Sequence, residues 1–321
     1  MTLVDNGGCC LIGCALRVIL SASRRTDIPA LYGDWMMNRL RSGFVLSANP
    51  FNPRQVSRVP LSPAWVDMIV FWSKQPEPML KHLEELDDMG YVYYFQYTLN
   101  GFGRDMEAGL GEVERRIDTF LALSERLGPL RVDWRFDPVL FCERYPMEEH
   151  LMRFERLACR LAPHTTRCIF SFADRYAHGP AWIQETTAAD QTRFVEEMAR
   201  IARPLNLELY TCCERQDFSG QGVKHASCID RDKIERILGV PVRARKHAGQ
   251  RADCGCIESV DIGAYDTCVH GCAYCYATHS LKLSQTRFAA HDPEAPSLIP
   301  LSENVKITDR PVKSDRRPAL I

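Results

Sequence analysis

The chain alternates short apolar segments typical of β-strands with longer amphipathic segments typical of helices, and this alternation restricts its fold more than any other feature. Strands are predicted at residues 18–22, 44–47, 68–72, 92–97, 130–135, 168–172 and 207–211. Helices are predicted between them at residues 32–41, 77–89, 105–127, 147–161 and 188–203. Strands such as 68–72 are apolar throughout, as parallel strands covered on both faces are. The pattern therefore predicts an α/β fold with a parallel sheet, and the number of units favours a TIM-type (β/α) barrel.

Charged side chains follow several predicted strands at the point where each strand ends. In a β/α barrel these ends meet at one rim, where active sites are built. Each residue taken singly also fits a solvated turn or a helix cap. Together, however, so many charges at strand ends are costly unless they pair or bind a ligand. We therefore predict catalytic or ligand-binding roles for Arg24, Arg25, Asp27, Lys74, Arg135 and Asp137.

Fourteen cysteines among 321 residues are the unusual part of the composition. The chain is long and lacks a convincing signal peptide, so the cysteines indicate a metal or iron–sulfur centre in a cytoplasmic protein rather than a disulfide scaffold. A formal net charge of −1 gives no overall basic field for nucleic acid, although a local basic groove is compatible with it. No apolar run reaches the roughly 18 residues of a membrane-spanning helix, which predicts no membrane partner.

The most specific motif is a C-x3-C-x2-C run formed by Cys268, Cys272 and Cys275, with Tyr274 directly before the last cysteine. A predicted strand at 259–265 precedes the run, and a segment able to start a helix follows it. This arrangement resembles the radical S-adenosylmethionine (SAM) motif. The resemblance implies that three thiolates hold a [4Fe–4S] cluster whose fourth iron binds SAM. It also implies that one electron from a reductase or ferredoxin-type donor cleaves SAM into methionine and a 5′-deoxyadenosyl radical, which abstracts hydrogen from a substrate.

A structural zinc site is the alternative for the cysteines, and it needs four ligands in tetrahedral geometry. The particular spacing of the triplet favours iron–sulfur over zinc there. The other clustered cysteines are less specific, because either zinc or a second [4Fe–4S] cluster suits their spacing. This second predicted ligand set is Cys212, Cys228, Cys254 and Cys256.

The position of the triplet is unusual, since radical SAM barrels carry the motif after their first strand and here it follows the last one. A closed barrel has no topological beginning, so moving the chain ends leaves the loop over the same rim. We therefore predict a circularly permuted, radical SAM-like barrel in which 260–265 replaces the first strand and lies parallel beside 18–22. The three motif sulfurs should lie within roughly 6 to 7 Å of one another, with no fourth cysteine completing them.

Four parts are predicted along the chain. An N-terminal extension at 1–17 precedes the barrel body at 18–211. A Cys-rich, metal-binding segment at 212–286 contains the last barrel strand and the iron–sulfur loop. The tail at 287–321 is rich in proline and charge, so we expect it to be ordered only by docking on the body, with its end loose.

Longer stretches carry a second resemblance, to the prokaryotic family called domain of unknown function 1848. The matching stretches are 19–30, 49–53, 69–74, 135–138, 254–265 and 268–277. The end of the cysteine motif and 135–138 also resemble spore photoproduct lyases, radical SAM enzymes that repair thymine dimers. The leading hypothesis is a radical SAM-like enzyme acting on an unknown small-molecule or nucleic-acid substrate. The alternatives are a non-catalytic, cysteine-rich metal-binding module and a nucleic-acid repair lyase.

Overall fold

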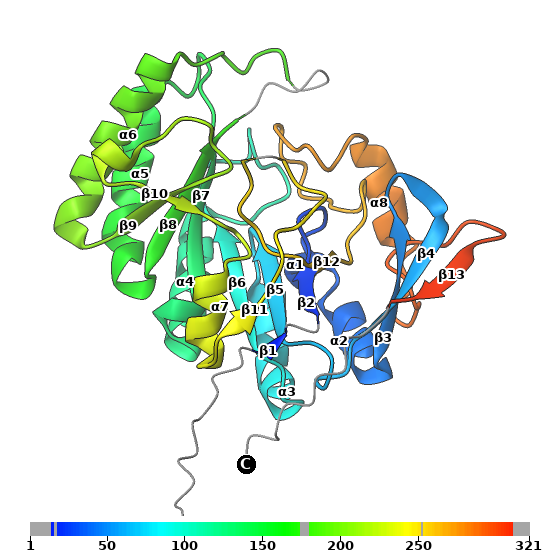
Figure 1. The fold of residues 1–321 in the computed structure, drawn as a ribbon. Coiled ribbons are helices and arrows are strands. Elements are labelled where there is room, and N and C mark those ends of the chain that lie inside the picture. The colour runs from blue at the N-terminus through cyan, green and yellow to red at the C-terminus, as the bar shows by residue number, and fades with distance from the viewer. Residues whose placement is uncertain (1–13, 16–17, 174–179, 252, 311–321) are drawn as a thin grey trace, which may run out of the picture.

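A parallel sheet of eight strands organises the protein (Figure 1), as a computed structural model describes it for residues 14–15, 18–173, 180–251 and 253–310. The spatial order is β10-β9-β8-β7-β6-β5-β2-β12. From β2 onward the strands follow one another as they do along the chain, and β12 alone is displaced to the edge beside β2. The strands are β2 (Ile19–Ala22), β5 (Met68–Ser73), β6 (Tyr93–Thr98), β7 (Val132–Val139), β8 (Arg167–Phe172), β9 (Glu208–Cys212), β10 (Lys224–Ala226) and β12 (Val260–Asp261).

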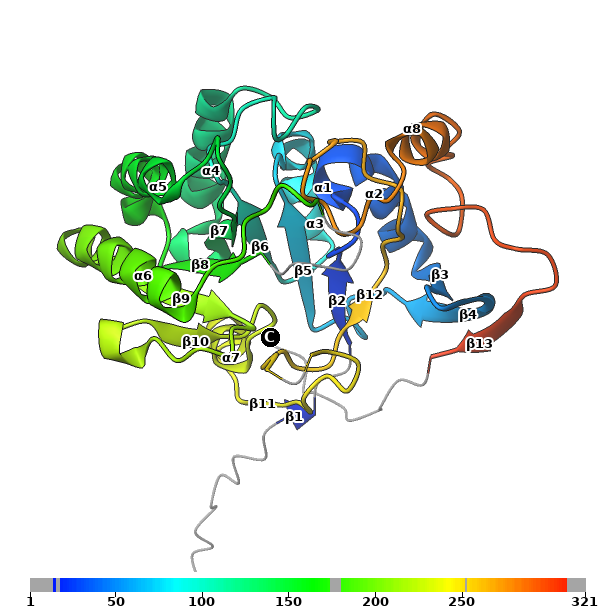
Figure 2. The same ribbon diagram turned by 90° about the horizontal axis from the view of Figure 1, so that it is seen from above.

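The helices that connect the strands cover the outer, convex face of this sheet (Figure 2). They are α1 (Ile28–Leu31), α2 (Gly33–Ser42), α3 (Leu83–Asp88), α4 (Val113–Leu127), α5 (Met147–Leu161) and α6 (Ala188–Ala202). Alternate strand residues such as Leu20, Phe71 and Trp134 are fully buried in the core on this side. Their neighbours point to the opposite, concave face, because successive side chains of a strand alternate. The predicted α/β class with a parallel sheet is therefore confirmed.

The neighbouring positions of the first and last strands are also confirmed. β12 pairs with β2 in parallel, with Val260 opposite Leu20 and Asp261 opposite Ser21. The pairing covers only these two residues of the predicted strand at 260–265. It is sufficient to bring the start of the cysteine loop to the carboxyl end of β2.

A different segment occupies the concave face of the sheet. In the described part of the chain the hydrogen-bonded sheet ends at β10 on one side and at β12 on the other. The segment that connects β10 to β12 along the chain belongs to the Cys-rich segment and contains α7 (Arg231–Leu238) and the short strand β11 (Val242–Arg243). β11 pairs with β1 (Cys14–Ala15). Apolar residues of that segment pack against inward-facing sheet residues in a second core that includes Ile19, Val70, Tyr94, Ile234 and Ile257.

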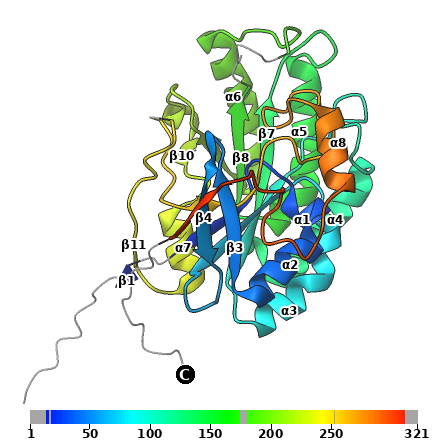
Figure 3. The ribbon, with the colours of Figure 1, turned by 90° about the vertical axis from the view of Figure 1, so that its right-hand side faces the viewer.

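The strand predicted at 44–47 is present, but it does not belong to the central parallel sheet. That segment is β3 (Phe44–Asn49), which forms an antiparallel hairpin with β4 (Asn52–Pro60) in a separate three-stranded sheet (Figure 3). The third strand, β13 (Lys306–Asp309), pairs with β4 in parallel. The hairpin turn at residues 50–51 lies between the two strands, and Phe51 in it is 92% exposed. Periodicity within so short a run does not say which sheet a strand joins.

The tail docks on the body through backbone acceptors. Trp35 Nε1 donates to Ala295 O at 2.9 Å, Arg39 to Glu294 O at 2.9 Å, and Leu46 N to Pro296 O at 2.8 Å. Helix α8 (Leu281–Ala289) connects the cysteine loop to this tail. Most of the predicted extension at 1–17 and the end of the tail lie outside the described residues. Within the described ranges, no helix has the length and apolar character needed to cross a membrane.

Candidate functional site

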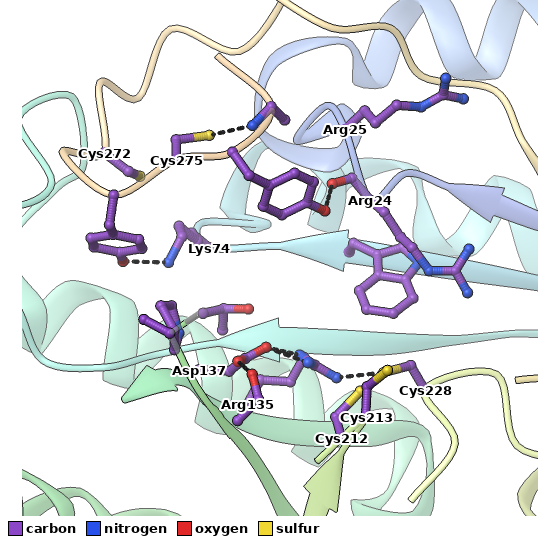
Figure 4. A pocket seen from close by; sticks show the side chains of 18 of the residues that line it. Arg24, Arg25, Lys74, Arg135, Asp137, Cys212, Cys213, Cys228, Cys272 and Cys275 are labelled. Atoms are coloured by element: carbon purple, nitrogen blue, oxygen red, sulfur yellow. Dashed lines mark hydrogen bonds and ion pairs between the residues drawn. The ribbon is translucent and has the colours of Figure 1, made fainter. Parts of the chain in front are cut away.

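One cavity of about 420 Å³ lies at the carboxyl ends of the sheet strands (Figure 4). Its lining joins the charged strand-end residues to both predicted sets of cysteines. All six predicted rim residues contribute to it: Arg24, Arg25, Asp27, Lys74, Arg135 and Asp137. The cysteines that contribute are Cys212, Cys213, Cys228, Cys254, Cys256, Cys268, Cys272 and Cys275.

Asp27 fixes the cysteine loop to the sheet. Its Oδ2 accepts from the Lys74 backbone N–H at 2.8 Å and lies 2.9 Å from His270 Nε2, within the loop. Its Oδ1 accepts from the Ala30 backbone N–H at 3.1 Å and so caps α1. The His270 contacts hold the pKa of Asp27 below its usual value, against the opposing effect of burial. Asp27 is therefore both the helix cap that its sequence position suggests and a positioning residue for the loop.

Glu107 forms a second attachment, and it is only 1% exposed. It accepts from Lys74 Nζ at 2.9 Å, from Arg116 Nη1 at 2.7 Å and from the Tyr274 hydroxyl at 2.5 Å. Burial alone would raise the pKa of Glu107, but the charges of Lys74 and Arg116 hold it at about 2. Gly109, two residues on, donates its N–H to His270 O at 2.7 Å, and a Cβ there would meet loop backbone at 2.8 Å.

This network predicts an acid-dependent stability. A Glu whose pKa falls from 4.5 to about 2 on folding stabilises the protein by about 3 kcal/mol above pH 4.5, and loses about 2 kcal/mol of this by pH 3. We expect Glu107→Gln to be about 2 to 3 kcal/mol less stable at pH 7 and to lack this part of the acid dependence. Urea unfolding at pH 7 and pH 3 measures both, with the exposed Glu125→Gln on α4 as control. Equal acid dependence in wild type and Glu107→Gln would contradict the assignment.

Asp261, at the end of β12, ties the first and last strands together. Its carboxylate accepts from Ser21 Oγ at 3.0 Å, Ser23 Oγ at 2.5 Å and the Arg24 backbone N–H at 2.9 Å. Arg25 Nη2 forms an ion pair with it at 3.0 Å. Arg25 is thus already paired, and its charge stabilises the strand edge from which the cysteine loop departs.

Arg135 and Asp137 form an ion pair on β7 that faces the second cysteine set. Arg135 Nη1 also donates to Cys228 Sγ at 3.0 Å and to Gln96 Oε1 at 3.1 Å. The Ser171 hydroxyl donates to the other oxygen of Asp137. Burial opposes the charge of Arg135, yet negative charge on Cys228 and Asp137 raises its pKa.

The triplet cysteines lie together at one wall of the cavity. Cys268 and Cys272 each interact electrostatically with the other motif cysteines, including Cys275. Burial raises the pKa of the Cys268 thiol to about 12, and it also raises that of Cys272. Cys275 Sγ accepts from the Ala277 backbone N–H at 3.4 Å. Thiols with such pKa values are protonated at neutral pH, so metal binding would displace their protons into solvent.

The second cysteine set is connected in the same way. Cys212 Sγ and Cys228 Sγ are 2.8 Å apart, and Cys256 interacts with both Cys228 and Cys254. The Ile229 backbone N–H donates to Cys256 Sγ at 3.4 Å. Across the described residues, no three His, Cys, Asp or Glu side chains stand as a ready ligand set for one metal ion. The donor chemistry of both sets is that of thiolate-bound soft metals and iron–sulfur clusters.

Four contributors were not among the predicted site residues. Glu107 holds the cysteine loop, and Asp261 holds the edge of the sheet. The His270 ring forms a hydrogen bond with the Asp27 carboxylate. The Trp72 ring lies beneath the Arg24 guanidinium, which is 5.0 Å from the ring centroid. Trp72 and Asp261 occupy strand ends, which the rule applied to the other rim residues would have included. Glu107 lies inside the segment predicted as helix 105–127, and no pattern in the sequence marks it.

A comparison with protein families matches residues 19–277 to the family described as "Domain of unknown function (DUF1848)". No curated protein matches the chain. Among solved structures, a putative alpha-L-fucosidase from Bacteroides thetaiotaomicron is similar at 9% identity, covering 74% of this chain and 100% of that one, with a TM-score of 0.28. A likeness at that level carries no argument about fold or function.

Proposed function

This chain belongs to the family described as a domain of unknown function (DUF1848), and because that description names no reaction, we propose a function from the site itself. The proposal is a radical SAM-like enzyme. Cys268, Cys272 and Cys275 would hold a [4Fe–4S] cluster with one open iron, at the mouth of a circularly permuted, partial TIM-type barrel. When SAM is bound, such a cluster supplies the electron that cleaves SAM to methionine and a 5′-deoxyadenosyl radical, which abstracts hydrogen.

The observation that carries the proposal is the position of β12. Its pairing with β2 puts the cysteine loop at the carboxyl ends of the parallel strands, where ligand sites of β/α folds are built. A chain that simply continued the sheet would have placed this loop beyond β10, away from β2. The three thiols line the same cavity as the charged strand-end residues, so a ligand held by the loop would meet them directly.

Most of the charged residues act on the loop rather than on a ligand in this proposal. Lys74 and Glu107 hold the Tyr274 hydroxyl, and Asp27 holds His270. These contacts fix the backbone on both sides of Cys272 before any metal binds. A preformed loop lowers the entropic cost of assembling three ligands, so Lys74, Glu107 and Asp27 are positioning residues.

The cellular setting follows from the same chemistry. The eleven described cysteines outside the N-terminal region are free thiols, which fits a reducing cytoplasmic compartment and an oxygen-sensitive cluster. A reductase or a ferredoxin-type protein would supply the electron. The substrate would be a small molecule or a nucleotide group that fits a cavity of about 420 Å³.

Anaerobic reconstitution tests the proposal. We expect protein supplied with iron and sulfide to become brown and, once reduced with dithionite, to convert SAM to methionine and 5′-deoxyadenosine, measured by chromatography. Without reductant, SAM should stay intact. A colourless protein that takes up zinc under these conditions and never cleaves SAM would contradict it, and would favour the non-catalytic metal-binding module.

A further inference from the structure

Two buried hydrogen-bond donors beside the second cysteine set have no acceptor. Within the described residues, neither Arg24 Nη2 nor Trp72 Nε1 has a hydrogen-bond partner. Both side chains line the cavity, and the guanidinium lies 5.0 Å from the indole centroid. Leaving a buried donor unsatisfied costs about 1 to 3 kcal/mol, so two adjacent ones indicate an acceptor that binds there.

A third donor and the surrounding charges locate that acceptor. Arg135 lies 5.3 Å from the same indole centroid and donates to Cys228 Sγ. Trp72 packs against the second core, which includes Cys228, Cys254 and Cys256. Two cations and an indole side chain therefore lie together beside the second cysteine set.

We propose that Cys212, Cys228, Cys254 and Cys256 hold a second, fully coordinated [4Fe–4S] cluster whose inorganic sulfides accept the hydrogen bonds of Arg24 and Trp72. The four cysteines are neighbours, since Cys212 Sγ lies 2.8 Å from Cys228 Sγ and Cys256 interacts with both Cys228 and Cys254, although their sulfurs would have to separate to hold a cubane cluster. The two donors remain unsatisfied beside them. Zinc would add no acceptor, whereas a cubane cluster adds four sulfides. A cluster with four thiolates also carries net negative charge, which Arg24 and Arg135 balance.

The proposal does not depend on SAM cleavage at the triplet. Four thiolates close the coordination of a cluster, so the second one would offer no open iron and would serve electron transfer. It would lie on the wall of the cavity that also contains the triplet, since both sets line the same space.

Iron and sulfide content after anaerobic reconstitution is the first test. We expect about eight iron and eight sulfide per wild-type chain, and about four of each in the Cys254→Ala/Cys256→Ala double variant. Cys213→Ala is the matched control, because Cys213 lines the same cavity next to Cys212 but is outside the proposed ligand set, and it should keep all eight. Circular dichroism identifies a variant that has failed to fold, in which case single Cys254→Ser and Cys256→Ser chains replace it.

The two proposals fail in different ways. If the double variant keeps the wild-type iron, or if wild type binds one zinc in place of four irons, the second cluster is refuted and SAM cleavage is unaffected. If wild type holds a second cluster lost in the double variant but never cleaves SAM, the second cluster stands and the proposed function fails.

The donors provide a second readout that does not need activity. Arg24→Met removes a cation, and Trp72→Phe removes the N–H donor while keeping a smaller aromatic ring, so each should lower the reduction potential of the second cluster in an EPR-monitored titration. Trp65→Phe, which lies outside the cavity lining, should leave the potential unchanged. Unchanged potentials in both donor variants would overturn the assignment of Arg24 and Trp72 as sulfide donors.

Discussion

Replacing Cys272 by alanine is expected to reduce reductive SAM cleavage to the level of a protein-free control. With only two thiolates left in the triplet, the [4Fe–4S] cluster loses the anchoring that its three-ligand coordination requires, and SAM loses its binding iron. Iron content should fall by about four per chain at the same time. Chromatography of 5′-deoxyadenosine and iron analysis on the same sample measure both effects.

The matched control is Cys159→Ala, which removes an exposed thiol on α5. It should retain wild-type iron and activity. Cys268→Ala and Cys275→Ala should behave like Cys272→Ala. Substantial SAM cleavage by any triplet variant would show that the cluster is held elsewhere, and the proposed function would then need a different ligand set.

Five of the eight described strands of the central sheet, β2, β5, β6, β8 and β9, could be predicted from the sequence to within one residue. β7 extends four residues beyond the predicted strand at 130–135, β12 ends four residues earlier than predicted, and β10 was not predicted. The predicted strand at 68–72 is β5 (Met68–Ser73), and 168–172 is β8 (Arg167–Phe172). A buried parallel strand is a short run of consecutive apolar residues, so its signal is local. The placement of β12 beside β2 was predicted from the resemblance to radical SAM barrels, which carry the cysteine motif after their first strand, and the pairing of the two strands confirms it.

Helix boundaries failed where tertiary contacts compete with local propensity. The predicted helix at 105–127 begins only at Val113. Residues before it are held out of the helix because Glu107 faces Lys74 and Arg116, and because Gly109 lies against the cysteine loop. Lys74 and the cysteine loop are distant from residues 105–112 in sequence, so a local sequence window does not reveal that these residues are held out of the helix.

The rim residues were predictable as a group but not in their roles. Strand ends bring Arg24, Lys74 and Arg135 to one cavity, as the β/α rule requires. Lys74 and Arg135 are nevertheless paired with carboxylates, Glu107 and Asp137, whereas Arg24 is the one of these three rim residues that keeps a buried donor without a partner in the described structure. Pairing depends on side chains from other elements, which a strand-end rule does not identify.

Asp133 lies on the concave face of the sheet, and its substitution is expected to lower the free energy of unfolding strongly. Its carboxylate is completely buried and accepts from Lys233 Nζ at 2.6 Å, from Arg167 Nε and Nη2 at 2.9 Å each, and from Gln96 Nε2 at 2.7 Å. These charges hold the pKa of Asp133 low although burial opposes ionisation. Lys233 lies on α7, so this one carboxylate attaches the Cys-rich segment to the inside of the sheet.

Asp133→Asn is therefore expected to cost about 3 to 5 kcal/mol of unfolding free energy, because it leaves the Lys233 and Arg167 cations buried with the Asp230 carboxylate as their remaining acid partner. Asp232→Asn, an exposed change one residue from Lys233, should stay within about 0.5 kcal/mol of wild type. Urea unfolding at pH 7 measures both.

Since α7 precedes Cys254 and Cys256 in the same segment, Asp133→Asn should also expose those thiols to alkylation faster than Cys268 and Cys272. The loop that contains Cys268 and Cys272 is attached separately, through Glu107 and Asp27. Equal acceleration at both cysteine sets would show that the two walls of the cavity unfold as one unit, and would contradict a separate attachment at Asp133.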